Sequence, residues 1–327
     1  MNRRRFNGAC SIALAFNLEL AVAQAPARPW RIGFLAFGAR PSDGLVPAAI
    51  RDELRTLGFE EGKDIAYEAR WSQARADNLP RLAVELLNLK VDVLIAFGGP
   101  AAEEAKRTFA TGPVVVLGAG DVVETGLVRS LAHPGGNITG VNDPAKDLSG
   151  KRLQILKELV PGAVRVAVLW NAGNLAMTLR YREIEKAGSM LGIEVEPLGV
   201  REPDDFDTAL AAMNRRRPDA LMMVTDTLTT LNRGRVLDYV RANHIPAIYE
   251  FSGVVHDGGL ISYGSELAES LALAADQVGR ILRGTKPGDL PVDQPSRYRL
   301  VINLSTAATL GLSVPPSLLQ RADEVIR

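Results

Sequence analysis

Residues 31–38 read RIGFLAFG, a short apolar run typical of a strand that is buried on both faces of a parallel sheet. Further strand and helix patterns alternate after it. They lie at residues 45–57 (helix), 65–71 (strand), 78–89 (helix), 91–98 (strand) and 113–118 (strand). This order predicts a parallel sheet covered by helices, because neighbouring parallel strands need a crossover, which is usually helical.

The same order of segments returns in the second half of the chain. The later segments that match the earlier ones are RVAVLW (165–170), LGIE (191–194), PDALMM (218–223) and IPAI (245–248). The repeat predicts an α/β fold of two doubly wound parallel-sheet lobes joined by a hinge. The alternative interpretation is a chance similarity between generic α/β segments.

We expect each lobe to be built from two separate stretches of the chain. Lobe 1 takes residues 29–142 and about 263–290, and lobe 2 takes residues 143–262 and about 291–327. The tail after Gly264 belongs to neither copy of the repeat. It carries one helix pattern (267–282), a Pro-rich connector (287–295) and one strand pattern (298–304), so it can return from one lobe to the other.

Three connections between the lobes are therefore expected. They lie near Asn142-Asp143-Pro144, near Gly258–Gly264 and near Pro287–Pro295. Proline fixes the backbone angle φ and glycine frees it, so both residue types suit the connectors of a hinge. Ligands of open parallel sheets bind at the carboxyl ends of the strands, which places the expected binding site between the lobes.

The N-terminus reads as an export signal. Arg3, Arg4 and Arg5 precede a mainly apolar stretch that ends in Ala21-Val22-Ala23, a small-residue cleavage motif. We expect residues 1–23 to be removed during export to the periplasm by the Sec route or, given the sequence RRRF, by the twin-Arg route. The alternative is a basic terminus without a targeting role.

The composition excludes several classes of function. The 38 basic and 38 acidic residues cancel, so no basic excess favours nucleic acid as a partner. One Cys and three His are too few for a disulfide framework or a paired-Cys metal site, so we expect no metal and no cofactor. No nucleophile elbow, P-loop or dinucleotide fingerprint is present in the sequence, which predicts that the protein is not an enzyme.

Polar and aromatic residues follow the predicted strands at the ends that face the cleft. Such residues make a pocket for a small molecule. The expected ligand contacts are Phe37, Gly98, Gly99, Asp121, Trp170, Asn171, Thr225, Asp226, Tyr249 and Glu250. The alternative interpretation of Trp170 is a core residue, and that of Asn171 and Asp226 is a helix cap.

Several longer segments resemble one family of transport proteins. They are DVVETGLVRSLAHPGGNITG (121–140), LQILKELVPG (153–162), IPAIYE (245–250), GGLISYG (258–264), VINLSTAATLGL (301–312) and PPSLLQRADEVI (315–326). Together they are similar to the ABC-transporter substrate-binding proteins of the family that includes tryptophan- and tyrosine-binding lipoproteins. The resemblance covers the chain from the export signal to the C-terminus.

This resemblance implies a type I periplasmic-binding-protein fold without catalysis. Such a protein captures a small molecule, an amino acid or another small metabolite, between two lobes and delivers it to an ABC permease, and we expect it to be a monomer. The family's Asn and Tyr-Glu positions are retained as Asn171 and Tyr249-Glu250, whereas Gly98-Gly99-Pro100 lacks the Thr that usually follows the paired glycines. A ligand-sensing protein for a membrane receptor and a secreted α/β enzyme are the alternatives.

Overall fold

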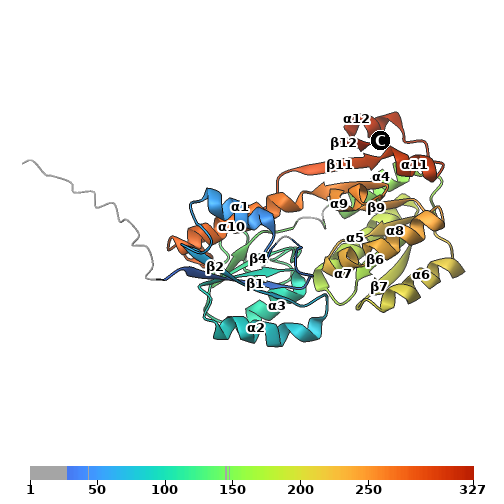
Figure 1. Cartoon of the computed structure of the whole chain (residues 1–327). Coiled ribbons are helices and arrows are strands. Elements are labelled where there is room, and N and C mark those ends of the chain that lie inside the picture. The colour runs from blue at the N-terminus through green and yellow to red at the C-terminus, as the bar shows by residue number, and fades with distance from the viewer. Residues whose placement is uncertain (1–27, 43, 144–145, 147) are drawn as a thin grey trace, which may run out of the picture.

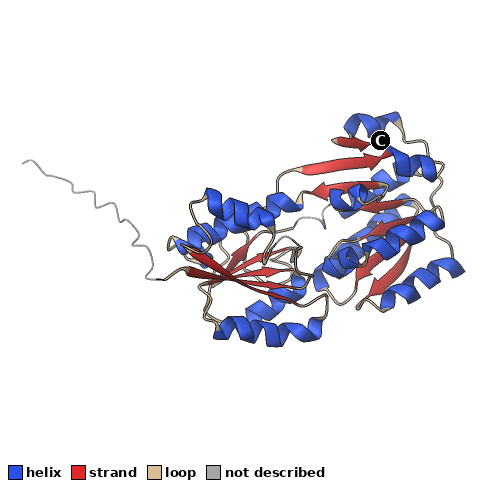
Figure 2. Ribbon diagram, in the orientation of Figure 1, coloured by secondary structure: helices blue, strands red, loops and turns tan. Residues whose placement is uncertain are grey.

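The computed structural model describes residues 28–42, 44–143, 146 and 148–327, so the predicted signal segment and Pro144 lie outside the described residues. Two sheets dominate the described chain, and helices cover both faces of each (Figures 1 and 2). The first sheet has the strand order β2-β1-β3-β4-β5, and the second has the order β12-β11-β10-β9-β8-β6-β7. We call the sheets, with the helices that pack on them, lobe 1 and lobe 2.

Lobe 1 is wholly parallel. Its strands and helices are β1 (Trp30–Ala36), α1 (Ala48–Thr56), β2 (Ile65–Trp71), the 3-10 helix η1 (Ala76–Asn78), α2 (Leu79–Asn88), β3 (Val93–Phe97), α3 (Gly99–Thr108), β4 (Val114–Leu117) and β5 (Ile138–Gly140), together with α10 (Leu267–Leu282) and η3 (Pro287–Asp289) from later in the chain. β5 is a short strand that the sequence patterns did not predict. It pairs with β4, and α10 packs against both α1 and β4.

Lobe 2 is parallel except where β10 meets β11. Its strands are β6 (Arg165–Asn171), β7 (Glu194–Val200), β8 (Ala220–Met223), β9 (Ala247–Tyr249), β10 (Ile261–Ser265), β11 (Tyr298–Asn303) and β12 (Glu324–Ile326). Its helices are α4 (Ser149–Leu159), α5 (Leu175–Leu191), α6 (Asp205–Arg215), α7 (Thr227–Leu231), α8 (Arg233–Ala242), α9 (Ser252–His256), α11 (Leu304–Thr309) and α12 (Pro316–Arg321).

The strand orders confirm the repeat. The first four strands of each half of the chain lie in the same order, β2-β1-β3-β4 in lobe 1 and β7-β6-β8-β9 in lobe 2. The strands are buried because helices cover both faces of the sheet. In β4, Val114 and Val116 belong to the apolar cluster beneath α2 and α3, while Val115 and Leu117 pack in the cluster against α10. An uninterrupted apolar run is the sequence signature of such a strand.

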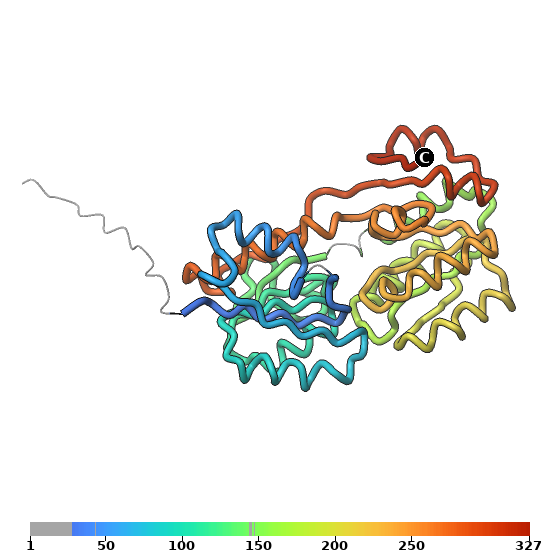
Figure 3. Tube along the Cα trace, in the orientation of Figure 1, coloured from blue at the N-terminus to red at the C-terminus, as the bar shows by residue number. Residues whose placement is uncertain are grey.

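The chain passes between the sheets three times (Figure 3). The first passage lies between β5 and α4, and the second follows Ser265, because residues 261–265 still pair with β9 and β11. The third comes after Asp293, whose backbone N–H donates to the carbonyl of Gly140 in lobe 1. The second passage thus lies just beyond the expected segment 258–264, while the exact residue boundaries of the lobes stay a prediction.

Among the described residues, no helix has the length and apolar character needed to span a membrane. The same part of the chain also contains no group of His, Cys, Asp and Glu side chains arranged to hold a metal ion.

Candidate ligand-binding site

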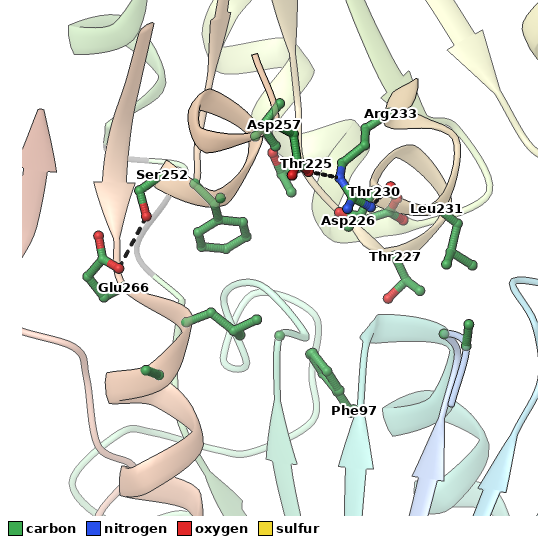
Figure 4. A pocket seen from close by; sticks show the side chains of 18 of the residues that line it. Phe97, Thr225, Asp226, Thr227, Thr230, Leu231, Arg233, Ser252, Asp257 and Glu266 are labelled. Atoms are coloured by element: carbon green, nitrogen blue, oxygen red, sulfur yellow. Dashed lines mark hydrogen bonds and ion pairs between the residues drawn. The ribbon is translucent and has the colours of Figure 1, made fainter. Parts of the chain in front are cut away.

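A cavity of about 640 Å³ opens between the two lobes at the carboxyl ends of their strands. Figure 4 shows lobe 2 residues on one side of it and Phe97, at the end of a lobe 1 strand, on the other. A volume of this size is typical of pockets for small molecules. The cavity therefore lies where the parallel-sheet topology predicts a site.

The lobe 1 wall is aromatic. Trp71 ends β2 and Phe97 ends β3, so the pleat of the sheet carries both rings to the cavity. Phe34 holds them from beneath, with its ring centroid 5.0 Å from that of Trp71 and 6.3 Å from that of Phe97. The indole N–H of Trp71 donates to the carbonyl of Leu45 at 3.1 Å, which leaves the apolar part of the ring system for the cavity.

The lobe 2 wall is polar where β8 ends. Thr225, Asp226 and Thr227 line the cavity between β8 and the start of α7. Asp226 is the N-cap of α7, and one of its carboxylate oxygens accepts the backbone N–H of Thr229 at 3.1 Å. The other oxygen accepts the side-chain amide of Asn171 at 2.6 Å. These bonds fix the carboxylate at the cavity wall.

The carboxylate of Asp226 has no cationic side chain as an ion-pair partner among the described residues. Burial raises its pKa above the ordinary value, although hydrogen bonds from Thr229, Asn171 and Asn174 oppose that rise. A negative charge at this wall is therefore costly in the empty cavity. A ligand that brings a positive charge would remove that cost.

A second polar group at this wall lacks a partner. Thr225 is only 5% exposed, and its hydroxyl oxygen makes no hydrogen bond within the described part of the chain. Burying a hydroxyl without a partner costs free energy. A ligand atom that bonded this hydroxyl would recover that cost.

Behind the same wall lies a buried cluster of four charges, Arg152, Arg180, Glu250 and Asp143. Glu250 accepts one guanidinium nitrogen from Arg152 at 2.9 Å and one from Arg180 at 2.7 Å, and Arg180 also pairs with Asp143 at 2.5 Å. Glu250 further accepts the backbone N–H of Thr225 at 3.2 Å. The cluster therefore fixes the backbone at the floor of the cavity, and we call it the buried quartet.

Charged residues at the rim of the cavity are paired with one another or with neighbours. Arg233 forms an ion pair of 2.6 Å with Asp257 (Figure 4). Glu266, which precedes α10, accepts the hydroxyl of Ser252 at 3.2 Å and lies 3.6 Å from the guanidinium of Arg299. Among the described residues of the cavity lining, Asp226 is therefore a carboxylate without a direct ion-pair partner.

Two residues expected from the sequence, Thr225 and Asp226, line this cavity directly. Asn171 is linked to this cavity through its hydrogen bond to Asp226. Asn171 and Phe37 line a smaller cavity of about 160 Å³ elsewhere between the lobes. Glu250 is in the buried quartet, 1% exposed, and so supports the wall without forming it.

Gly98 and Gly99 lie where the lobes touch. Gly98 has φ of +95°, and a Cβ added to it would come within 3.2 Å of Phe37 and 3.5 Å of the Thr227 hydroxyl. A Cβ on Gly99 would lie 2.8 Å from the side-chain oxygen of Asn174, in lobe 2. These glycines allow the start of α3 to approach lobe 2 closely.

The structure places Asp121, Trp170 and Tyr249 away from the cavity lining. Asp121 caps a turn by accepting the backbone N–H groups of Val123 and Glu124. The Trp170 ring stacks on Tyr181 with centroids 4.0 Å apart, as its alternative interpretation as a core residue anticipated. The side chain of Tyr249 faces a separate cavity of about 60 Å³.

Strand-end position missed part of the site. Trp71, Phe97, Met177, Phe251 and Arg233 line the cavity and were not expected from the sequence. Trp71 and Phe97 are themselves the last residues of strands, the position for which Trp170 was chosen in the second half of the chain, so the same rule applied to every strand would have found them. Met177, Phe251 and Arg233 lie on or before helices, where strand ends give no signal.

Comparisons with known proteins show the family of this chain. The family described as ABC transporter substrate binding protein matches residues 32–326. The chain belongs to this family. Its members are extracytoplasmic solute-binding proteins and not enzymes, which confirms the class predicted from the sequence.

The substrate-binding protein has relatives of known name and structure. A tyrosine-binding protein of Clostridioides difficile is 25% identical over 259 residues, which are 79% of this chain and 74% of the relative. An ABC domain from Streptococcus pneumonia in complex with L-Trp has a TM-score of 0.84 at 24% identity, over 91% of this chain and all of that one. A ligand-free, open substrate-binding protein from Clostridium difficile has a TM-score of 0.63 at 22% identity, over 91% of this chain and 99% of that one. The two solved structures show the fold.

Proposed function

We propose that the cavity binds a small molecule with an apolar or aromatic body and an ammonium group, such as an amino acid. The protein would capture this molecule outside the cytoplasm and deliver it to an ABC permease. The observation that carries the proposal is the uncompensated carboxylate of Asp226 opposite the aromatic wall of Trp71 and Phe97.

The two walls of the cavity suit different parts of such a ligand. The ammonium group would neutralise Asp226 and remove the cost of its buried charge. The aromatic faces of Trp71, Phe97 and Phe251 favour an apolar body, and aromatic faces also attract a nearby cation. The hydroxyl of Thr225 offers a further hydrogen bond to a polar atom of the ligand.

The relatives support an amino acid as the ligand class. The curated relative is named for tyrosine, and one solved structure with the same fold holds L-Trp. This chain differs from the family pattern after β3, where Pro100 follows the paired glycines directly. The ligand carboxylate would therefore lack one hydroxyl partner at the start of α3, and the ammonium group would contribute more of the selectivity.

The arrangement of the two lobes supports the capture of a ligand between them. The TM-score of this chain is higher against the L-Trp complex than against the ligand-free, open relative.

The proposal includes export by the N-terminal segment, a periplasmic location, action as a monomer without nucleic acid as a partner, and the lobe boundaries given above. N-terminal sequencing of exported protein tests cleavage near Ala23, and finding only the intact form in the cytosol would contradict it.

The ligand proposal is tested by calorimetry with three matched indoles. L-tryptophan carries both groups, tryptamine lacks the carboxylate, and indole-3-propionate lacks the ammonium group. We expect tryptamine to bind at least about tenfold more tightly than indole-3-propionate, because only the amine neutralises Asp226. The same three comparisons with tyrosine, tyramine and the deaminated acid extend the test to a second aromatic body.

Two variants separate the effect of the Asp226 carboxylate on binding from the effect of the overall charge of the protein. Asp226→Asn should lose most of the preference for the amine, since the amide is uncharged while it can still accept the cap hydrogen bond of α7. Asp207→Asn is the matched control, because Asp207 is an exposed residue of α6 and pairs with Arg235 away from the cavity. Equal binding of amine and acid by the parent protein would refute the proposed ligand class.

A further inference from the structure

We propose that Asp143 determines the charge specificity of the cavity by neutralising Arg180 behind its wall. This inference rests on the proposed function, since it explains why the cavity favours a cationic ligand although two arginines are buried next to it. Without Asp143, the positive charge of Arg180 would offset the negative charge of Asp226.

The position of Asp143 is the first support. Asp143 lines the cavity with 17% of its side chain exposed, while Arg180, 2% exposed, lies behind it. The carboxylate of Asp143 and a guanidinium nitrogen of Arg180 are 2.5 Å apart. Asp143 is thus the member of the buried quartet that stands between Arg180 and the ligand space.

The charge of the quartet is the second support. Arg152 and Arg180 contribute two positive charges, and Glu250 and Asp143 contribute two negative charges. Burial lowers the pKa of Arg180, but the charges of Asp143, Glu250 and Asp226 outweigh it and raise that pKa above its ordinary value. Arg180 is therefore fully charged, and its field reaches Asp226.

The rim does not supply an alternative source of charge. Arg233 is paired with Asp257, and Glu266 lies beside Arg299. Among the described lining residues, Asp226 is the carboxylate without a direct ion pair, so it contributes strongly to the charge that faces the ligand. Removing the carboxylate of Asp143 would make the charge around this space more positive by one unit.

The backbone fixes Asp143 independently of the lobe that carries Arg180. Arg180 belongs to α5 in lobe 2, whereas Asp143 lies on the connection after β5. The backbone N–H of Asp143 donates to the carbonyl of Gly120, and that of Asn142 donates to the carbonyl of Asp293. The carboxylate is therefore presented to Arg180 from the lobe 1 side.

The test is the ratio of affinities for tryptamine and indole-3-propionate, measured by calorimetry on the full mature chain. Asp143→Asn keeps the size of the side chain and one acceptor oxygen but removes the carboxylate that pairs with Arg180 on the cavity side. We expect the preference for tryptamine to fall by about tenfold or more, because a charge in a low-dielectric interior acts strongly over a few ångströms. Asp207→Asn, which removes the same charge from the exposed surface, should leave the ratio unchanged.

A second variant reverses the sign of the effect. Arg180→Gln leaves Asp143 and Glu250 with Arg152 alone, so the wall becomes more negative and the preference for tryptamine should rise. The double variant Asp143→Asn with Arg180→Gln removes one charge of each sign and should return the ratio toward that of the parent. The two single variants shift the ratio in opposite directions, so whichever folds, as checked by thermal unfolding, decides the question.

The outcomes separate this inference from the proposed function. If the parent shows no preference for tryptamine, the proposed ligand class fails. If the parent prefers tryptamine and Asp143→Asn keeps the same ratio as Asp207→Asn, the role of Asp143 is refuted while the ligand class stands. A fall in the ratio with Asp143→Asn, or a rise with Arg180→Gln, supports the inference.

Discussion

At the scale of single residues, Asp226 combines two roles. Its carboxylate caps α7 and is held by Asn171, and the same group faces the ligand cavity without a cationic partner. The sequence offered a helix cap and a ligand contact as alternative interpretations; the structure shows the cap, and the ligand contact stays a prediction. The capping bonds keep the carboxylate in place before a ligand arrives, which limits the ordering cost of binding.

The raised pKa of Asp226 predicts a pH-dependent affinity. An ammonium ligand favours the ionised carboxylate, so the pKa of Asp226 is lower in the complex than in the free protein. Affinity should be highest above the free-state pKa and should fall as pH decreases through it, by up to about tenfold per pH unit. Calorimetry with tryptamine from neutral to acidic pH measures this.

Asp226→Asn provides the control for this pH series. The variant has no carboxylate at the site, so its weaker binding should be nearly flat over the same range. An equally steep decline in the variant would assign the pH dependence to a group other than Asp226.

At the scale of elements, the start of α3 sets how closely the lobes approach. Gly99 opens this helix against Asn174, which caps α5 by accepting the backbone N–H of Ala176. Asn174 cannot turn away from a new methyl group without giving up that cap. A side chain at Gly99 is therefore expected to oppose the close contact between the start of α3 and lobe 2.

Gly99→Ala should weaken ligand binding by about tenfold without unfolding the protein. The added Cβ would lie 2.8 Å from the Asn174 oxygen, a distance that forces the lobes or the cap to shift. Calorimetry gives the affinity, and thermal unfolding gives the stability. Gly234→Ala in α8 is the control, because its Cβ would meet nothing within 4 Å and should leave the affinity unchanged. Parent-like affinity in Gly99→Ala would show that this contact does not limit closure.

The elements themselves were largely predictable, because buried parallel strands and amphipathic helices have distinct periodicities. The helix at 267–282 and the strand at 65–71 have the predicted bounds. β5 was missed because its three residues, Ile138–Gly140, are too few to show a period. The site was harder to predict: strand-end position found Asp226, but the same rule also selected Trp170, whose ring packs on Tyr181 away from the cavity.

At the scale of the whole molecule, we expect ligand binding and lobe closure to be one equilibrium. A ligand shifts it only through contacts that it makes better in the closed form. Trp71 of lobe 1 and Asp226 of lobe 2 face one cavity, so a ligand that touches both supplies such contacts.

Tryptophan emission should report this closure through Trp71. The protein has 3 tryptophans, and of these Trp71 lines the cavity while Trp170 is stacked on Tyr181. Excitation at wavelengths longer than the tyrosine absorption band selects the tryptophans of the protein. We expect L-tyrosine or tyramine to change this emission in the parent and in Trp170→Phe, but not in Trp71→Phe. Calorimetry on each variant confirms that the ligand still binds. A signal that disappears only in Trp170→Phe would show that the ligand acts on Trp170 and not on Trp71.

The buried quartet also limits where the protein can bend. Arg180 holds Asp143 on the first connection, and Arg152 donates to the carbonyl of Tyr263, two residues before the second connection leaves β10. The quartet thus holds the first connection and the end of β10, from which the second connection leaves, at one place in lobe 2. We expect any rotation of the lobes to be absorbed by backbone torsions close to these two contacts.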